Sequence, residues 1–98
     1  MWKQLNTLGT VGSENGKIFA DEEYEKSCRI TLEKCERYYA ITCGVYGDMV
    51  HTAFTDEANC WGMYNAMKHD LESFIDRMED MSIDERSDFY DIFTDTYH

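Results

Sequence analysis

The chain contains no proline, and only nine of its 98 residues are lysine or arginine. It also has no long apolar run: its start, MWKQLNTLGTVGSENG, lacks the hydrophobic stretch that a signal peptide or a membrane span requires. The scarcity of basic residues argues against nucleic-acid backbones and anionic membranes as partners, because both attract clusters of lysine and arginine. We therefore expect a cytoplasmic protein that binds neither nucleic acid nor membranes.

The spacings that define metal, cofactor and catalytic sites are also lacking. Cys28, Cys35, Cys43 and Cys60 form no C-x-x-C pair, and no closely spaced histidines complete a zinc site. Residues 9–16, GTVGSENG, are glycine-rich, but they contain an acid and precede an expected strand rather than the helix that a phosphate loop needs. We predict no metal, no cofactor and no catalytic residue.

Acidic residues, in contrast, are abundant and unevenly distributed. The net charge is −11; residues 1–55 carry eight acids and six bases, whereas residues 56–98 carry twelve acids and three bases, a net of −9. Hydrophobic residues make up 43% of the chain and aromatics 14%, which is enough for a packed core. We expect a single domain over residues 1–98.

Alternation of apolar and polar residues predicts a β-hairpin around residues 47–48. A two-residue turn there pairs Val45 with Val50 on an apolar inner face, and it places Met49 and His51 on the opposite, outer face. We interpret His51 as an exposed strand residue, because a catalytic histidine needs a nucleophile and an orienting acceptor within reach.

An earlier turn gives a hairpin with the same inner face, in which Cys28 lies opposite Cys43. Two buried thiols among apolar residues are more typical of small hydrophobic side chains than of a redox pair. Upstream, residues 17–20 read as a short strand followed by an acidic turn at residues 21–23. Residues 2–11 could add an edge strand, although Leu5, Leu8 and Val11 do not alternate cleanly.

After Thr55 the apolar residues recur at intervals of three and four, the spacing of a helix with one buried face. The repeating residues are Cys60, Tyr64, Met67, Leu71, Phe74, Met78 and Met81, with Trp61 and Ile75 widening the stripe. Ser82 and Glu85 match the S-x-x-E capping box, which predicts a second helix. That helix should begin at Ile83 and bury Phe89, Ile92 and Phe93. The fold class is therefore α+β: an antiparallel meander of three to five strands in the N-terminal half, then two C-terminal helices packed on one sheet face.

The second helix also carries four aspartates on one narrow face, here called the acidic stripe: Asp84, Asp88, Asp91 and Asp95. Like charges at these spacings destabilise a helix by roughly 0.2–0.5 kcal/mol per pair. Local stability therefore does not account for the stripe. It is either a solvated face that tolerates the charge or a docking face for a basic protein partner.

The outer sheet face is a second candidate surface. It is less polar than a freely solvated face, and tyrosine and methionine are enriched at interfaces. The residues predicted to form an interface or ligand-binding face here are Tyr38, Tyr46, Met49 and His51. Either the N-terminal segment with Trp2 and Leu5 folds over this face, which needs no extra assumption, or a second molecule covers it.

Three function classes follow, in order of preference. The first is a small acidic protein-interaction module that binds a basic protein, resembling immunity and antitoxin proteins in size and charge only. The alternative is a homo-oligomeric structural protein, for instance a homodimer, or a small-ligand-binding protein that uses the outer sheet face. An enzyme comes third, because no catalytic constellation is recognisable.

Overall fold

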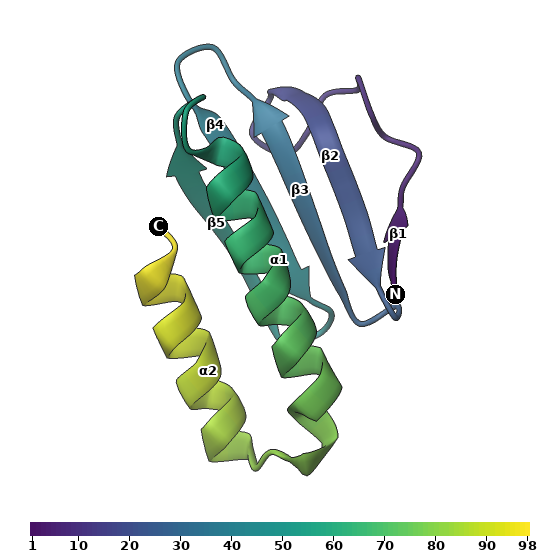
Figure 1. The fold of residues 1–98 in the computed structure, drawn as a ribbon, viewed down its shortest axis with the longest axis vertical. Helices are drawn as coiled ribbons and strands as arrows, with labels where there is room; N and C mark the ends of the chain where they lie inside the picture. Colours follow the sequence, from purple (N-terminus) through teal and green to yellow (C-terminus); the bar gives the residue numbers. More distant parts are fainter.

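The computed structural model describes residues 1–98 as one antiparallel sheet and two helices. The elements are β1 (Trp2–Gln4), β2 (Lys17–Tyr24), β3 (Cys28–Lys34), β4 (Tyr39–Val45), β5 (Met49–Thr55), α1 (Cys60–Arg77), a 3-10 turn (Met78–Asp80) and α2 (Ile83–Thr96). The strands lie in chain order, and both helices cover one face, the inner face (Figure 1). The expected α+β meander is confirmed. Neither helix combines the length and apolarity that crossing a membrane demands.

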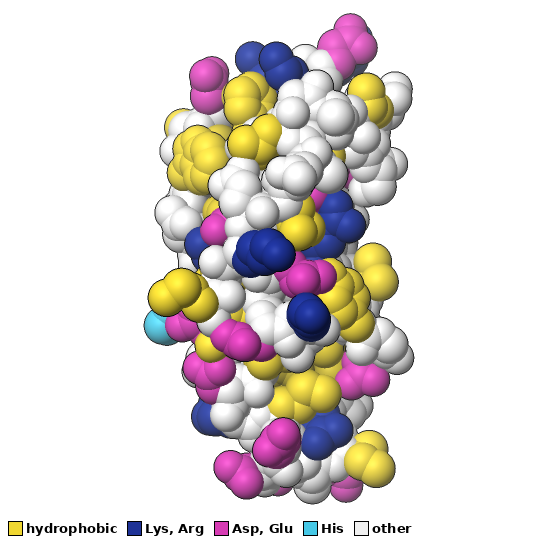
Figure 2. Space-filling view, turned by 90° about the vertical axis from the view of Figure 1, so that its right-hand side faces the viewer, with side chains coloured by type: hydrophobic (Ala, Val, Ile, Leu, Met, Phe, Trp, Pro, Cys, Tyr) yellow, Lys and Arg dark blue, Asp and Glu magenta, His cyan; other side chains and the backbone are white.

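The N-terminal segment does not cover the outer face in the expected way. Trp2 lies on the helix side, where its Nε1 donates to Glu72 (2.8 Å) and the Lys68 ammonium stands 5.3 Å from its ring. Leu5 donates its N–H to a backbone carbonyl of β2 and so continues along the edge of the sheet. The N-terminal segment reaches the outer face at Thr7, whose hydroxyl donates to Asp21, and at the turn of residues 12–16. Seen from the β1 side, charged side chains of both signs are interspersed (Figure 2).

β2 runs through the acidic residues that were expected to form a turn at 21–23. These residues stay in the strand because each has a partner: the Asp21 carboxylate, for example, accepts from Arg29 on β3 at 2.8 Å. The turn lies instead at Glu25 and Lys26, whose φ angles are 50° and 56°. Two successive positive φ angles are characteristic of the type I′ hairpin turn.

The β3–β4 register differs from the prediction by two residues. Cys28 lies opposite Val45, and Cys43 lies opposite Ile30. A shift of two leaves every side chain on its predicted face, so the buried face of both strands was predicted correctly. Both thiols are free and buried, and burial raises the pKa of each to about 12.

The β4–β5 register differs by one residue, which reverses β5. Residues 46–48 form a three-residue connection, so Val45 lies opposite Met49 rather than Val50. Because side chains alternate along a strand, this slip puts Met49 and His51 on the inner face and Val50 on the outer face. The predicted faces of β5 were wrong.

Glycine chemistry explains the longer turn. The Asp48 N–H donates to the Val45 carbonyl (2.9 Å), and Gly47 adopts φ 81° at the third position of the turn. A positive φ at this position favours glycine, whereas the two-residue turn assumed from the sequence places Gly47 one position earlier.

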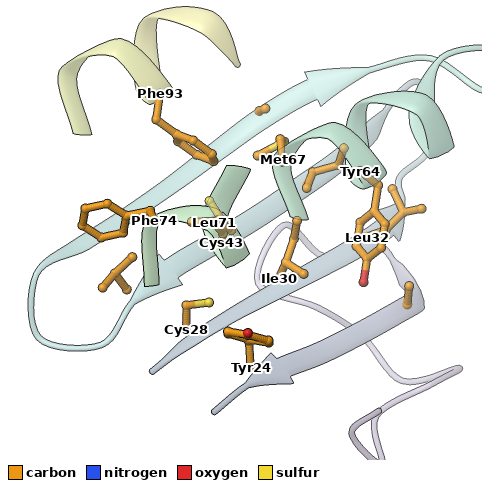
Figure 3. Packing of buried hydrophobic residues seen from close by; sticks show 14 of the residues in the cluster. Tyr24, Cys28, Ile30, Leu32, Cys43, Tyr64, Met67, Leu71, Phe74 and Phe93 are labelled. Atoms are coloured by element: carbon orange, nitrogen blue, oxygen red, sulfur yellow. The ribbon is translucent and has the colours of Figure 1, made fainter. Parts of the chain in front are cut away.

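The core lies between α1 and the inner face (Figure 3). The residues of α1 with at most 2% of their surface exposed are Cys60, Tyr64, Met67, Leu71 and Phe74, as the period predicts. Burial of each large side chain stabilises the fold by about 1.5–3 kcal/mol. Trp61, expected to widen this stripe, is 51% exposed.

α2 begins at the predicted capping box. Ser82 Oγ accepts from the Glu85 N–H (3.1 Å), and the Glu85 carboxylate accepts from the Ser82 N–H (3.0 Å). Phe93 is buried, and Phe89 packs beside it. Ile92 is 67% exposed, contrary to expectation, because each helical step turns the side chain by about 100° away from its neighbour.

Candidate functional site

The acidic stripe lies on the solvent side of α2. All four aspartates are exposed, and no side chain of the four forms an ion pair or a hydrogen bond. The opposite side of the helix presents Phe89 and Phe93 to the core. The capping box fixes where the helix starts, and the four-three-four spacing then holds the carboxylates together on one face.

The charge of the helical half is uncompensated within the chain. None of the twelve acids in residues 56–98 is in an ion pair, because the three cations there have other partners. Lys68 pairs with Glu22 of β2 at 2.9 Å. Arg77 donates to a carbonyl one turn earlier, and Arg86 donates twice to the Met78 carbonyl, at 2.8 and 3.1 Å. The helices therefore present a surface of strong negative potential.

The outer sheet face is hollowed. A groove of about 590 Å³ runs across β3 and β4, bounded by residues 12–13 on one side and by the β4–β5 turn on the other. Its lining includes Arg29, Thr42, Tyr46 and Val50. The groove mixes hydroxyl groups with apolar surface, and its volume lies in the range of small-molecule sites, which is about 300–1,000 Å³.

An ion pair between a buried carboxylate and a partly exposed guanidinium lies at this groove. Asp21 has no exposed surface; Arg29 donates to it from Nε (2.8 Å) and Nη2 (2.5 Å), and Thr31 donates at 3.0 Å. Burial acts to raise the pKa of the Asp21 carboxyl, but the hydrogen bonds from Arg29, Thr7 and Thr31 outweigh burial and lower that pKa below its usual value. Asp21 is therefore ionised and holds the Arg29 guanidinium in place.

Glu33 fixes the loop at the other end of the face. It is fully buried, and its Oε1 accepts from the backbone N–H groups of Glu14 (2.9 Å) and Gly16 (3.0 Å). A Cβ at Gly12 would stand 2.1 Å from Oε2, so any larger residue there would have to displace the Glu33 carboxylate. Oε2 has no hydrogen-bond partner. The partners are backbone groups 17 and 19 positions away, so no sequence pattern indicates this contact.

The four residues predicted for the outer face lie in different places. Tyr38 is on that face and meets Phe54 edge-on, with ring centroids 5.3 Å apart. Tyr46, in the β4–β5 turn, donates its hydroxyl to a carboxylate of β2 at 2.6 Å. Met49 packs on the core, and His51 Nε2 contacts a backbone carbonyl at the C-terminal end of α2. The structure brings Tyr38 and Tyr46 to this face and turns Met49 and His51 to the helices.

The apolar residues that do face outward on β5 were missed. Val50 is 82% exposed and Phe54 is 47% exposed. The sequence signal that identifies them is the glycine at position 47. It fixes the length of the turn and therefore which alternate residues of β5 face outward.

Comparison of the chain with protein-family models, with curated proteins and with solved structures gives no match. No three histidine, cysteine, aspartate or glutamate side chains are grouped so that they could hold a metal ion.

Proposed function

We propose that this protein is a small cytoplasmic protein-interaction module that binds a basic protein through the helix layer. The observation that carries the proposal is the absence of any ion pair among the twelve acids of residues 56–98. A basic partner supplies the missing counter-charges, which accelerates association and fixes orientation. The acidic stripe is the centre of this surface.

Two variants of equal charge test the proposal. The stripe variant carries Asp84→Asn, Asp88→Asn, Asp91→Asn and Asp95→Asn. The control carries Glu36→Gln, Glu57→Gln, Glu79→Gln and Asp80→Asn, four exposed acids whose carboxylates form no ion pair or hydrogen bond. Each immobilised variant and the unchanged protein are used for affinity capture, followed by elution with increasing salt.

The expected result is a basic protein that the unchanged chain and the control retain, that the stripe variant releases, and that elutes as salt screens the charges. Retention of the same proteins by both variants would contradict a role for the acidic stripe. Binding that salt does not weaken would contradict an electrostatic partner.

The groove supports a second candidate, a small-ligand-binding protein. It is about 590 Å³ in volume and is lined by both hydroxyl and apolar groups. A native mass spectrum of the purified protein tests this function. An adduct of constant mass supports a retained ligand, and a spectrum of the bare chain alone contradicts one.

A further inference from the structure

β5 is an open sheet edge. No hydrogen bond joins its backbone to any part of the chain other than β4. Its seven residues, MVHTAFT, include no charged residue and no proline, the usual devices that block strand addition at an edge. β1, the other edge, is only three residues long, and charged side chains surround it (Figure 2). An unpaired edge of this length is a ready template for another strand.

The sequence of β5 is complementary to itself. In an antiparallel pair centred on Thr52, Val50 lies opposite Phe54 of the second copy, and Phe54 lies opposite that copy's Val50. Both residues face outward and are exposed, so pairing covers two apolar contacts that a single chain leaves in water. The strand carries no charge, and therefore no like charges meet across the axis.

α2 lies beside this edge. Tyr90 donates its hydroxyl to Asp48 in the β4–β5 turn at 2.8 Å, so the Tyr90 side of the helix is turned toward the hairpin. The uncharged residues Ile83, Ser87 and Thr94 share that side, because they lie seven, three and four positions from Tyr90. Arg86, also four positions away, carries a charge and donates to the Met78 carbonyl. Ile83 is 82% exposed. The acidic stripe lies on the solvent side of α2, opposite Phe89 and Phe93.

We propose that two copies of this chain pair antiparallel through their β5 edges about a two-fold axis at Thr52, which joins the two sheets into one of ten strands. This inference is independent of the proposed function, because it uses β5 and not the acidic stripe. Each copy carries a net charge of −11, so the dimer forms against long-range repulsion and is strengthened when salt screens it.

Sedimentation equilibrium over a range of protein concentrations, at low and high salt, tests the dimer. The expected mass rises from 11.5 kDa toward twice that value, and more readily at high salt. Thr52→Glu brings two carboxylates together at the axis and is expected to weaken the dimer by about tenfold or more. Thr52→Val and Ser73→Glu, which adds the same charge on the exposed side of α1, should keep it.

Hydrogen exchange gives a second reading that does not depend on a variant. The β5 amides that point away from β4 should gain protection as protein concentration rises. A monomer mass under all conditions overturns the proposal, and so does a dimer that Thr52→Glu leaves intact or that gives β5 no protection. Salt weakens binding to a basic partner but strengthens this dimer, so failure of one proposal is distinguishable from failure of the other.

Discussion

The hydroxyl of Tyr24 donates a hydrogen bond to the Asp76 carboxylate at 2.6 Å and so joins β2 to α1. This contact is one of five in which a tyrosine hydroxyl meets a carboxylate from another element, in a chain that has seven tyrosines. The pairs are Tyr24–Asp76, Tyr46–Glu23, Tyr64–Glu22, Tyr90–Asp48 and Tyr97–Asp70. A chain with few cations uses tyrosine to satisfy its carboxylates.

The tyrosine pairs predict loss of stability in alkali. The hydrogen bond to Asp76, with burial added, raises the pKa of Tyr24 to about 12; burial, with a carboxylate partner, raises the pKa of Tyr46 and of Tyr97 to about 12. The unfolded pKa is about 10, so this stabilisation is complete below pH 10 and is lost as pH rises toward 12. Absorbance and circular dichroism recorded together should show late, cooperative ionisation. Ionisation of all the tyrosines near pH 10, with the fold intact, would contradict a stabilising role for the tyrosine–carboxylate pairs.

Removing a single hydroxyl tests the contribution of one pair. Tyr24→Phe should lower the free energy of unfolding by about 1 kcal/mol in urea titrations at neutral pH. Tyr39→Phe is the control, because no hydrogen bond of the Tyr39 hydroxyl is present. An equal effect of the two changes would show that the hydroxyl contact with Asp76 does not stabilise the fold.

The buried Asp21 predicts a pH-dependent effect of its partner. Arg29→Met should cost roughly 2–3 kcal/mol at neutral pH, because a buried carboxylate loses its cation. The lowered pKa of Asp21 stabilises the fold above the unfolded value near 4, and this stabilisation is lost as pH falls through the folded pKa. Urea titrations should therefore show a smaller difference between variant and unchanged protein in acid. Arg37→Met, at an exposed residue without a partner, should have little effect at either pH.

The β2–β3 turn offers a stabilising change. Lys26 has φ 56°, a conformation that costs an ordinary residue about 1 kcal/mol and costs glycine almost nothing. Lys26→Gly should therefore raise the midpoint of thermal unfolding. Arg37→Gly, in the next turn and without a positive φ, should lower it. Destabilisation by both glycines would contradict the type I′ geometry at residues 25–26.

Thiol reactivity separates the four cysteines. Cys28, Cys43 and Cys60 are buried, whereas Cys35 is partly exposed. Burial raises the pKa of the Cys35 thiol as well, so its reaction with a disulfide reagent should be slow but still the fastest of the four. Mass spectrometry after brief labelling should show one modified residue, Cys35. Rapid labelling of two or more thiols without denaturant would contradict the buried core.

Regular patterns allowed much of this fold to be predicted. The period of α1 identified its five buried residues, the capping box placed the start of α2, and alternation identified the inner faces of β3 and β4. These signals are local and repeat many times, so a single misplaced residue does not hide them. The exposed face of the acidic stripe followed from the same helical spacing.

Features that depend on one turn or one distant partner could not be predicted. The length of the β4–β5 connection decides which alternate residues of β5 face the core. Because the sequence predicted two residues there instead of three, Met49 and His51 were assigned to the wrong face. The fully buried acids Asp21 and Glu33 look solvated in the sequence, because their partners come from other strands and loops. The groove and the open β5 edge could not be predicted either, because they depend on the length of the β4–β5 connection and on contacts between residues far apart in the sequence.

The meander order also shapes how the chain is made. Each strand hydrogen-bonds only to neighbours in the chain, so every hairpin is complete as soon as its second strand leaves the ribosome. The helices that cover the inner face are synthesised last, and until then Ile30, Leu32 and Ile41 stand open to water. A nascent sheet with a bare apolar face is a substrate for chaperones, and this interval ends only when α1 has been synthesised and docks.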